Sequence, residues 1–395
     1  MSISPKHNQQ LLLDIFKAYE DAKRHKGNTS NALRFAENYE HKLFKLYDDI
    51  LHRKYVIGQS VCFIVHKPVQ REIFAADFRD RIVHHLIFNY INPIFEKHFI
   101  KDSYSCRIGK GTSKGIQRIQ QFMRSCSENY QKDCWILKLD IQGYFMSIDR
   151  IKIFEKIKKR LSTIRNPDFD RELILYLIEI VIFHDPTTNC YIKGKRSDWN
   201  GLPKSKSLFY AHENKGFPIG NLTSQLFGNI YLDEFDHWIK ERYRMDYYGR
   251  YVDDMIFIHV DKDFLTSIVK AIQVRLKDSL GLQLHPKKIY LQKNIQGVHF
   301  LGAYVKPWRI YIGKKTKSNC ITALTMWNKK FENSNSIHDQ KEIDAFVSCM
   351  NSYLGLMKQY KTGTLRKKVI KKFTDRVHSS IDVFPQYGKI KAHLL

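Results

Sequence analysis

The stretch Tyr247-Tyr-Gly-Arg-Tyr-Val-Asp-Asp-Met-Ile-Phe-Ile-His-Val260 decides the fold. Two β-rich runs flank the adjacent carboxylates of Asp253 and Asp254, which predicts a hairpin with the acids at its tip. The second run is almost wholly apolar, so its strand is expected to be buried. Because an unpaired buried carboxylate is strongly disfavoured, the acids need a cation, and Mg²⁺ prefers such oxygen ligands. An Asp-Asp pair alone is also common in ordinary turns. A matching acid elsewhere in the chain is therefore needed to favour a metal site over an ordinary turn.

A third carboxylate of the right kind ends an earlier apolar run. Cys134-Trp-Ile-Leu-Lys-Leu-Asp140 predicts a buried strand that finishes at an acid. Asp140, Asp253 and Asp254 together would supply the carboxylates of a two-metal site for phosphoryl transfer. A turn with two aromatic residues follows this strand and leads into a basic amphipathic helix at about 150–161.

The composition indicates a polyanionic partner. The 395 residues include 66 Lys and Arg against 40 Asp and Glu, a net charge of +26. There is no signal peptide and no apolar run of about 18 residues or more, which predicts a cytoplasmic protein with no membrane partner. The seven cysteines are scattered without metal-binding spacing, so we expect them to be reduced and mainly to pack.

The beginning of the chain predicts helices and one basic hairpin. Residues 1–55 are helical in character, and Asp77 is placed to cap a helix that carries His84 and His85 in packing or surface roles. Between these parts, Lys67-Pro-Val-Gln-Arg71 interrupts a β-rich region and predicts a hairpin that offers two cations.

Later segments are glycine-rich or increasingly basic. Residues 104–115 form a glycine-rich basic loop, suited either to a phosphate chain or to an ordinary surface turn. Residues 184–215 are expected to be a long irregular loop, and 216–225 to open an apolar helix at about 226–232. Residues 306–395 hold 18 Lys or Arg and 6 Asp or Glu, with helices predicted at 320–332, 340–360 and 363–380.

The order and spacing of Asp140, Gly220 and Asp253-Asp254 resemble the palm of a reverse transcriptase. The resemblance runs from about residue 60 to the end of the chain, and further matching segments support it: Arg71, Asp80-Arg81, Arg107-Ile-Gly-Lys-Gly, Gly281-Leu-Gln-Leu with Lys288, Phe300-Leu301-Gly302 and Ser352-Tyr-Leu-Gly355. It implies an α+β right-hand polymerase with fingers at 56–135, a palm at 136–305 that has a fingers-like insertion at about 162–215, and a helical basic thumb at 306–395. Residues 1–55 would be a helical N-terminal extension.

The resemblance also implies roles for individual residues. Two Mg²⁺ ions, with Mn²⁺ as an alternative, would be held by Asp140, Ile141, Asp253 and Asp254, the three acids being catalytic. The incoming dNTP would be bound by Lys67, Arg71, Phe145, Ile219, Gly220, Gln225 and Lys288, with Phe145 as the aromatic gate that rejects a 2′-hydroxyl. RNA template and cDNA would contact Arg107, Lys110, Phe300, Leu301 and Gly302.

One departure from the common reverse transcriptase pattern narrows the resemblance to a subgroup of that family. Retroviral, retron and group II intron enzymes carry Gln-Gly followed by Ser-Pro, whereas this chain has Ile219-Gly220 and then Ser224-Gln225. That pattern resembles the reverse transcriptases of diversity-generating retroelements, which are prokaryotic or phage-encoded. Such enzymes copy a template-repeat RNA with errors at adenines, the cDNA replaces a variable repeat in a target gene, and a small basic accessory protein that forms a pentameric barrel assists.

Two other functions stay open from the sequence. A prokaryotic reverse transcriptase that acts in anti-phage defence would share every catalytic residue with the retroelement enzyme. A nucleic-acid-binding protein without catalysis would share the basic charge, although the presence of all three acids argues against it.

Overall fold

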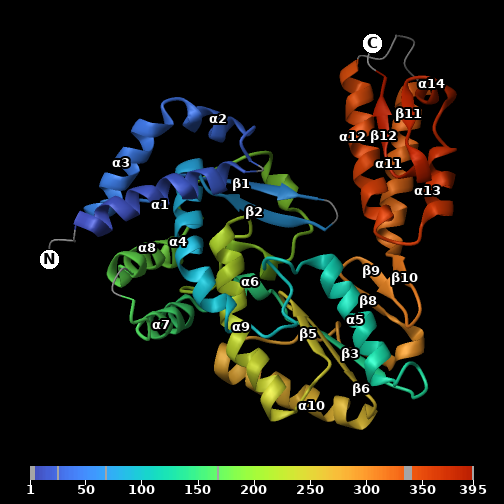
Figure 1. Ribbon diagram of the computed structural model, residues 1–395, viewed down its shortest axis with the longest axis horizontal. Helices are drawn as coiled ribbons and strands as arrows, with labels where there is room; N and C mark the ends of the chain where they lie inside the picture. Colours follow the sequence, from blue (N-terminus) through green and yellow to red (C-terminus); the bar gives the residue numbers. More distant parts are fainter. Residues whose placement is uncertain (1–4, 25, 67–68, 167–168, 333–339, 394–395) are drawn as a thin grey trace. The chain divides into compact units, whose positions relative to one another are not determined.

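The computed structural model describes residues 5–24, 26–66, 69–166, 169–332 and 340–393 (Figure 1). Its contacts divide the chain into two compact units, each described here by itself. Unit 1 comprises Met1–Gly111, Lys138–Phe257 and Asp263–Tyr290, and unit 2 comprises Thr112–Leu137, Ile258–Lys262 and Leu291–Leu395. The division into fingers, palm and thumb stays a prediction.

Helices and antiparallel strands are mixed along the whole chain, so the predicted α+β class is confirmed. The helices are α1 (Pro5–Lys23), α2 (Ser30–Ala36), α3 (Tyr39–Leu51), α4 (Phe78–Glu96), α5 (Thr112–Cys126), α6 (Tyr144–Ser147), α7 (Arg150–Leu161), α8 (Arg171–Phe183), α9 (Leu222–Arg242), α10 (Lys262–Arg275), α11 (Lys314–Glu332), α12 (Gln340–Lys358), α13 (Gly363–Ile370) and α14 (Asp375–His378). The strands are β1 (Ser60–Val65), β2 (Arg71–Ala75), β3 (Trp135–Asp140), β4 (Cys190–Ile192), β5 (Tyr248–Tyr251), β6 (Asp254–His259), β7 (Tyr290–Lys293), β8 (Val298–Phe300), β9 (Ala303–Val305), β10 (Ile310–Ile312), β11 (Ile381–Val383) and β12 (Ile390–Ala392).

The N-terminal helices of unit 1 pack around α4. Helix α1 lies against α3 and α4, and α2 also contacts α4 (Figure 1). Helix α1 has an apolar face that is buried at Leu11, Ile15 and Tyr19. Asp77 caps α4, because its carboxylate accepts a hydrogen bond from the N–H of Arg79. The predicted helices and the predicted cap are therefore confirmed.

The predicted basic hairpin is formed by β1 and β2. The two strands are antiparallel, with Val65 opposite Arg71. The irregular loop predicted at 184–215 is only partly irregular, because β4 adds to this sheet in parallel with β1. A three-residue strand is too short to leave a periodic signal in the sequence.

A buried carboxylate fixes the rest of that loop on the sheet. Glu72 of β2 accepts hydrogen bonds from the indole of Trp199 at 2.6 Å, the hydroxyl of Ser207 at 2.7 Å and the N–H of Leu208 at 2.6 Å. A carboxylate buried without such donors would be strongly destabilising. Glu72 therefore ties the segment from Trp199 to Leu208 to β2.

The acids predicted to be catalytic lie on a four-stranded sheet with the strand order β5-β6-β3-β7. The predicted strands and the helix at 150–161 are confirmed by β3, β5, β6 and α7. None of the described helices combines the length and the apolar composition needed to cross a bilayer. All seven cysteines are free, as predicted, and four of them are buried.

Unit 2 has a core of its own between the C-terminal helices. Phe331 of α11 and Phe346, Met350 and Leu354 of α12 are buried in it, which confirms two of the three predicted helices. The third prediction, one helix over 363–380, is wrong. The helix stops at Ile370. A turn closed by a hydrogen bond from the N–H of Phe373 to the carbonyl of Ile370 then brings Phe373 into the same core, and α14 and the β11–β12 hairpin follow.

A buried histidine links two helices of unit 1. The Nδ1 atom of His84 on α4 lies 2.8 Å from the hydroxyl of Thr223 on α9, so the predicted packing role is confirmed for this residue. Burial lowers the pKa of His84 to about 3, because the charged imidazolium would lose its water.

We expect this histidine to make the fold sensitive to acid. Between its ordinary pKa of about 6.5 and its folded pKa of about 3, the unfolded chain binds a proton that the folded chain does not. This contribution to stability is complete above about pH 6.5 and is lost as the pH falls, by at most about 1.4 kcal/mol per pH unit. Urea unfolding at about pH 7 and pH 5 should show the loss in the wild type and a smaller one in His84→Asn. The exposed His41→Asn serves as the control, and an equal loss in His84→Asn would exclude His84 as its source.

Candidate active site

The two central acids lie at a tight turn. Strands β5 and β6 are antiparallel with Tyr251 opposite Asp254, so only Val252 and Asp253 connect them. The predicted hairpin is confirmed, with Asp254 opening its second strand. Val252 has a φ of +56°, in the left-handed region that β-branched residues avoid. Such strain persists only where the surroundings hold the backbone in place.

A buried ion pair provides that hold. The side chains of Arg250 and Asp236 are 0% and 1% exposed, and their closest approach is 2.6 Å from Nη2 to Oδ2. The Nε of Arg250 donates to both oxygens of Asp236, at 2.8 and 2.9 Å. The Nη1 of the same guanidinium donates to the carbonyl of Val252 at 2.9 Å. Arg250 thus connects helix α9 to the strained turn.

The neighbouring backbone is fixed as well. The N–H of Tyr104 donates to the carbonyl of Arg250, and the N–H of Arg250 donates to the carbonyl of Asp102, each at 2.9 Å. A Cβ atom at Gly249 would lie 2.7 Å from the Tyr104 hydroxyl, so only glycine fits in that place. Strand β5 is therefore held along its backbone and through the side chain of Arg250.

The three predicted acids influence one another. Burial, together with the charges of Asp140 and Asp254, raises the pKa of Asp253 to about 7. Two lysines neutralise the other two acids. Lys288 donates to both oxygens of Asp140 at 2.8 Å, and Lys138 lies 3.1 Å from Asp254.

The end of β3 positions both Asp140 and Lys288. The carbonyl of Asp140 accepts a hydrogen bond from the N–H of His285 at 2.8 Å, and Ile141 forms a bridge with Leu284. Lys288 follows in the same turn, since its N–H donates to the carbonyl of His285 at 3.0 Å. The apolar side chain of Ile141 is buried, so only its carbonyl oxygen has the chemistry of a metal ligand.

The donor set fits a divalent cation in its chemistry. The acids offer carboxylate oxygens that repel one another, and two of them already hold an ammonium group. Within the described residues, no three His, Cys, Asp or Glu side chains are gathered closely enough to enclose one ion. Binding of a divalent cation at Asp140 would therefore require Lys288 to release its oxygens.

Two of the predicted nucleotide-binding residues share one apolar cluster. Phe145 on α6 and Ile219 both pack against its buried side chains, which are Cys62, Phe74, Met146 and Leu208. Gly220 has a φ of +130°, and a Cβ there would lie 2.9 Å from the carbonyl of Phe74. The helix predicted at 226–232 is longer, because α9 begins at Leu222. Exposed Gln225 lies in its first turn and accepts a hydrogen bond from the thiol of Cys106 at 2.6 Å.

Arg107 and Lys110, the basic residues predicted to contact nucleic acid, both donate hydrogen bonds within the protein. Arg107 is turned inward, where it donates to Glu96 and to the carbonyls of Ile100 and Ser103, and its contact with nucleic acid stays a prediction. Lys110 donates to the carbonyl of Lys101 at 2.8 Å.

The structure describes one of the two cations that are predicted to bind the triphosphate from the fingers. Arg71 is exposed at the start of β2, whereas Lys67 lies outside the described residues.

In unit 2, the predicted nucleic-acid contacts Phe300, Leu301 and Gly302 lie at a hairpin turn. Phe300 of β8 is opposite Ala303 of β9, and Leu301 and Gly302, with φ of +50° and +83°, connect them. Two positive φ values are typical of a type I′ turn. The ring of Phe300 is buried, and the contact of these three residues with nucleic acid stays a prediction.

Sequence reasoning missed Asp236, Arg250 and Lys138. The available signal was charge in otherwise apolar surroundings, since Asp236 follows Phe235 on the buried face of α9 and Arg250 lies in a strand. Buried charges of this kind are almost always paired.

Known proteins resemble this chain in part. A model of the family described as "Reverse transcriptase (RNA-dependent DNA polymerase)" matches residues 66–305. Protein YkfC of Escherichia coli (strain K12) is 26% identical over 165 residues, which are 42% of this chain and 36% of YkfC. The solved structure of apo telomerase from Candida tropicalis is 11% identical, with a TM-score of 0.47 over 82% of this chain and 62% of that chain. Telomerase from Candida albicans, in complex with the TWJ fragment of telomeric RNA, is 12% identical, with a TM-score of 0.43 over 87% and 60%. The match thus covers less than two thirds of each of these three proteins.

Removing Asp236 should destabilise the protein strongly. Asp236→Ala leaves the charge of Arg250 buried without a partner, and such a change costs about 3–5 kcal/mol. The apparent free energy of unfolding in urea measures the effect. Asp233→Ala, on the same helix, is the matched control and should lose much less. If both variants lost the same amount, the ion pair would not be what holds the turn.

Proposed function

The chain belongs to the reverse transcriptase (RNA-dependent DNA polymerase) family, and on this premise we propose that it copies an RNA template into DNA by two-metal nucleotidyl transfer. The observation that carries the proposal is the placement of Asp140 at the end of β3, Asp254 at the start of β6 and Asp253 in the turn before it, with Lys288 at Asp140 and Lys138 at Asp254. A buried acid such as Asp253, whose pKa is raised by burial and by neighbouring carboxylates, is typical of catalytic sites.

Each acid has a distinct place in the proposed site. Asp140 and Asp253 would hold two Mg²⁺ ions, or Mn²⁺, with Asp254 less directly involved and the carbonyl of Ile141 as a further oxygen donor. The bound ions would activate the primer 3′-hydroxyl and neutralise the charge of the triphosphate. The turn held by Arg250 keeps Asp253 in place before substrate arrives, so little reorganisation is needed during the reaction.

The remaining residues would bind the substrates. Lys288, which holds Asp140 in this structure, is close enough to the acids to reach a triphosphate once it releases them. Lys67 and Arg71 would contact the same phosphates, by resemblance to the fingers of the family. Phe145 would stack under the sugar and exclude a 2′-hydroxyl. Lys110 and other basic groups would hold RNA template and cDNA mainly through phosphates, and the backbone of the Leu301-Gly302 turn would add a contact.

The proposed biological role is diversity-generating retrohoming. The Ile219-Gly220 and Ser224-Gln225 pattern supports it, by resemblance to enzymes that copy a template-repeat RNA with errors at adenines. A small basic accessory protein that forms a pentameric barrel would be the partner. Anti-phage defence is the alternative role, and it uses the same chemistry. Reading the flanking DNA separates them, since retrohoming requires a repeat pair that differs at adenines.

Polymerisation should require the charge of Asp253. Asp253→Asn keeps the shape of the side chain and removes its charge, so we expect dNTP incorporation on a primed RNA to fall at least ~10²–10³-fold, as for the loss of one preorganised electrostatic group. Asp246→Asn, at an exposed acid in the same region, should leave the rate unchanged. Retention of more than about a tenth of the wild-type rate in Asp253→Asn would refute the metal assignment.

Fidelity at adenine should depend on Ile219. Isoleucine can only fill space against the apolar cluster, whereas glutamine adds a hydrogen bond worth about 0.5–1.5 kcal/mol, a roughly threefold to tenfold change in discrimination. We expect Ile219→Gln to lower misincorporation opposite template adenines more than opposite other bases. Sequencing cDNA made from one RNA measures this, with Ile219→Leu as the apolar control. Equal adenine error rates in wild type and Ile219→Gln would remove Ile219 from the explanation.

A further inference from the structure

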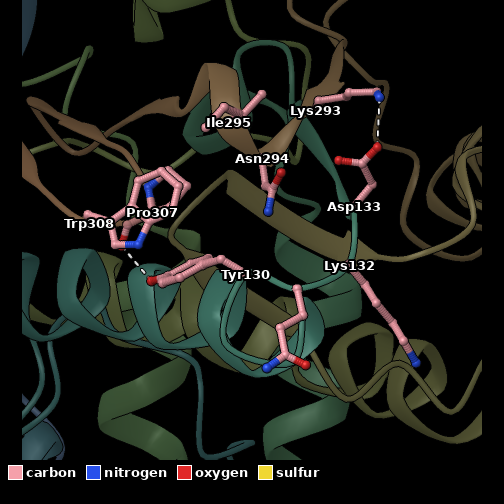
Figure 2. A pocket seen from close by; sticks show the side chains of 9 residues that line it. Tyr130, Lys132, Asp133, Lys293, Asn294, Ile295, Pro307 and Trp308 are labelled. Carbon is pink, nitrogen blue, oxygen red and sulfur yellow. Dashed lines mark hydrogen bonds and ion pairs between the residues drawn. The ribbon is translucent and has the colours of Figure 1, made fainter.

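Unit 2 contains a cavity of about 490 Å³ that involves none of the predicted site residues (Figure 2). Two aromatic rings, a buried amide and two lysines line it. The volume lies within the range of small-ligand pockets, which is roughly 300–1,000 Å³. The cavity therefore has the size and the mixed lining of a binding site.

An exposed tryptophan forms one wall. Trp308 is 68% exposed, whereas the other four tryptophans are only partly exposed. It lies in the turn between β9 and β10, with Lys306 and Arg309 on either side. The turn is rigid, because Gln120 of α5 donates to the carbonyls of Lys306 and Pro307 at 3.1 and 3.2 Å. The backbone that carries this exposed aromatic ring is thus anchored to α5.

A strained loop places a second ring beside it. Glu128, Asn129 and Tyr130 all have positive φ, at 48°, 58° and 69°. The N–H of Asn129 donates to the carbonyl of Arg124 at 2.9 Å, and the N–H of Tyr130 donates to the hydroxyl of Ser127 at 3.0 Å.

This loop presents the Tyr130 ring 4.9 Å from that of Trp308, and its hydroxyl donates to the carbonyl of Pro307 (Figure 2). Strain kept at consecutive residues is a reason to look for function.

The opposite wall is polar. Asn294 is 5% exposed, and Figure 2 shows its amide between the aromatic pair and the pair formed by Lys293 and Asp133. Lys293 lies 2.8 Å from Asp133, and Lys132 lies 2.7 Å from Glu128. These four side chains are between 44% and 66% exposed, and ion pairs so open to water contribute little. Both ammonium groups can therefore turn to a phosphate.

We infer that this cavity binds one nucleotide of a single-stranded nucleic acid. The base stacks on Trp308, the amide of Asn294 hydrogen-bonds the edge of the base, and Lys132 and Lys293 contact the flanking phosphates. Stacking on aromatic rings beside basic groups is the usual way in which proteins bind single strands, whose bases are free to leave the stack. The inference rests on the proposed function, which supplies both RNA template and DNA product, and adds a contact outside the predicted polymerase site.

The test uses the full chain and a short labelled oligouridylate, with the matching oligodeoxyuridylate in a parallel arm. Fluorescence anisotropy at moderate salt should show that Trp308→Ala binds about fivefold to 150-fold more weakly, the range for loss of one stacked base. Trp308→Phe keeps a stacking ring and should bind nearly as well as the wild type. Phe44→Ala, which removes a 52%-exposed ring of α3, is the matched control and should change nothing. Comparison of the two arms shows whether RNA, DNA or both are bound.

The outcomes separate this inference from the proposed function. Equal binding of wild type and Trp308→Ala in both arms would overturn the inference, even if the wild type incorporates dNTPs. A selective loss in Trp308→Ala supports it, even if the wild type incorporates none and the proposed polymerase activity fails. Quenching of tryptophan fluorescence by the oligonucleotide should also be weaker in Trp308→Phe than in the wild type. An undiminished quench would place the bound base elsewhere and contradict the assignment.

Discussion

The ion pair between Arg250 and Asp236 is the interaction on which the candidate active site depends. Both charges are withdrawn from water, which would be destabilising if either lacked its partner. The guanidinium has more donors than the carboxylate can use, and one of them reaches the carbonyl of Val252. A single buried cation therefore holds a helix, a strand and a strained turn together. The position of Asp253 follows from this arrangement.

Electrostatic balance is the second constraint on the site. Three carboxylates near one another would repel, and the chain provides lysines from different segments to offset them. Lys138 comes from the strand that ends in Asp140. Lys288 comes from a turn that lies 148 residues after Asp140 in the sequence. The acids are thus accommodated within a chain whose overall charge is strongly positive.

Local patterns predicted the elements well, and long-range contacts account for most of what they missed. The hairpin at Asp253, the strand ending at Asp140 and the cap at Asp77 are each encoded within a few neighbouring residues. The pairing of β4 with β1, the inward turn of Arg107 and the partner of Arg250 depend on residues distant in sequence, so no local period reveals them. The break after Ile370 was missed because the helical pattern continues in sequence while the core of unit 2 draws Phe373 inward.

Strand β2 is hydrogen-bonded to two other segments of unit 1. At one end, exposed Arg71 adjoins Glu72, whose carboxylate is bonded to three groups between Trp199 and Leu208. Further along, the N–H of Phe74 donates to the carbonyl of Ile219 at 3.0 Å. One strand therefore joins Arg71, the Trp199–Leu208 segment and Ile219 through direct hydrogen bonds, so that three segments far apart in sequence share a single support.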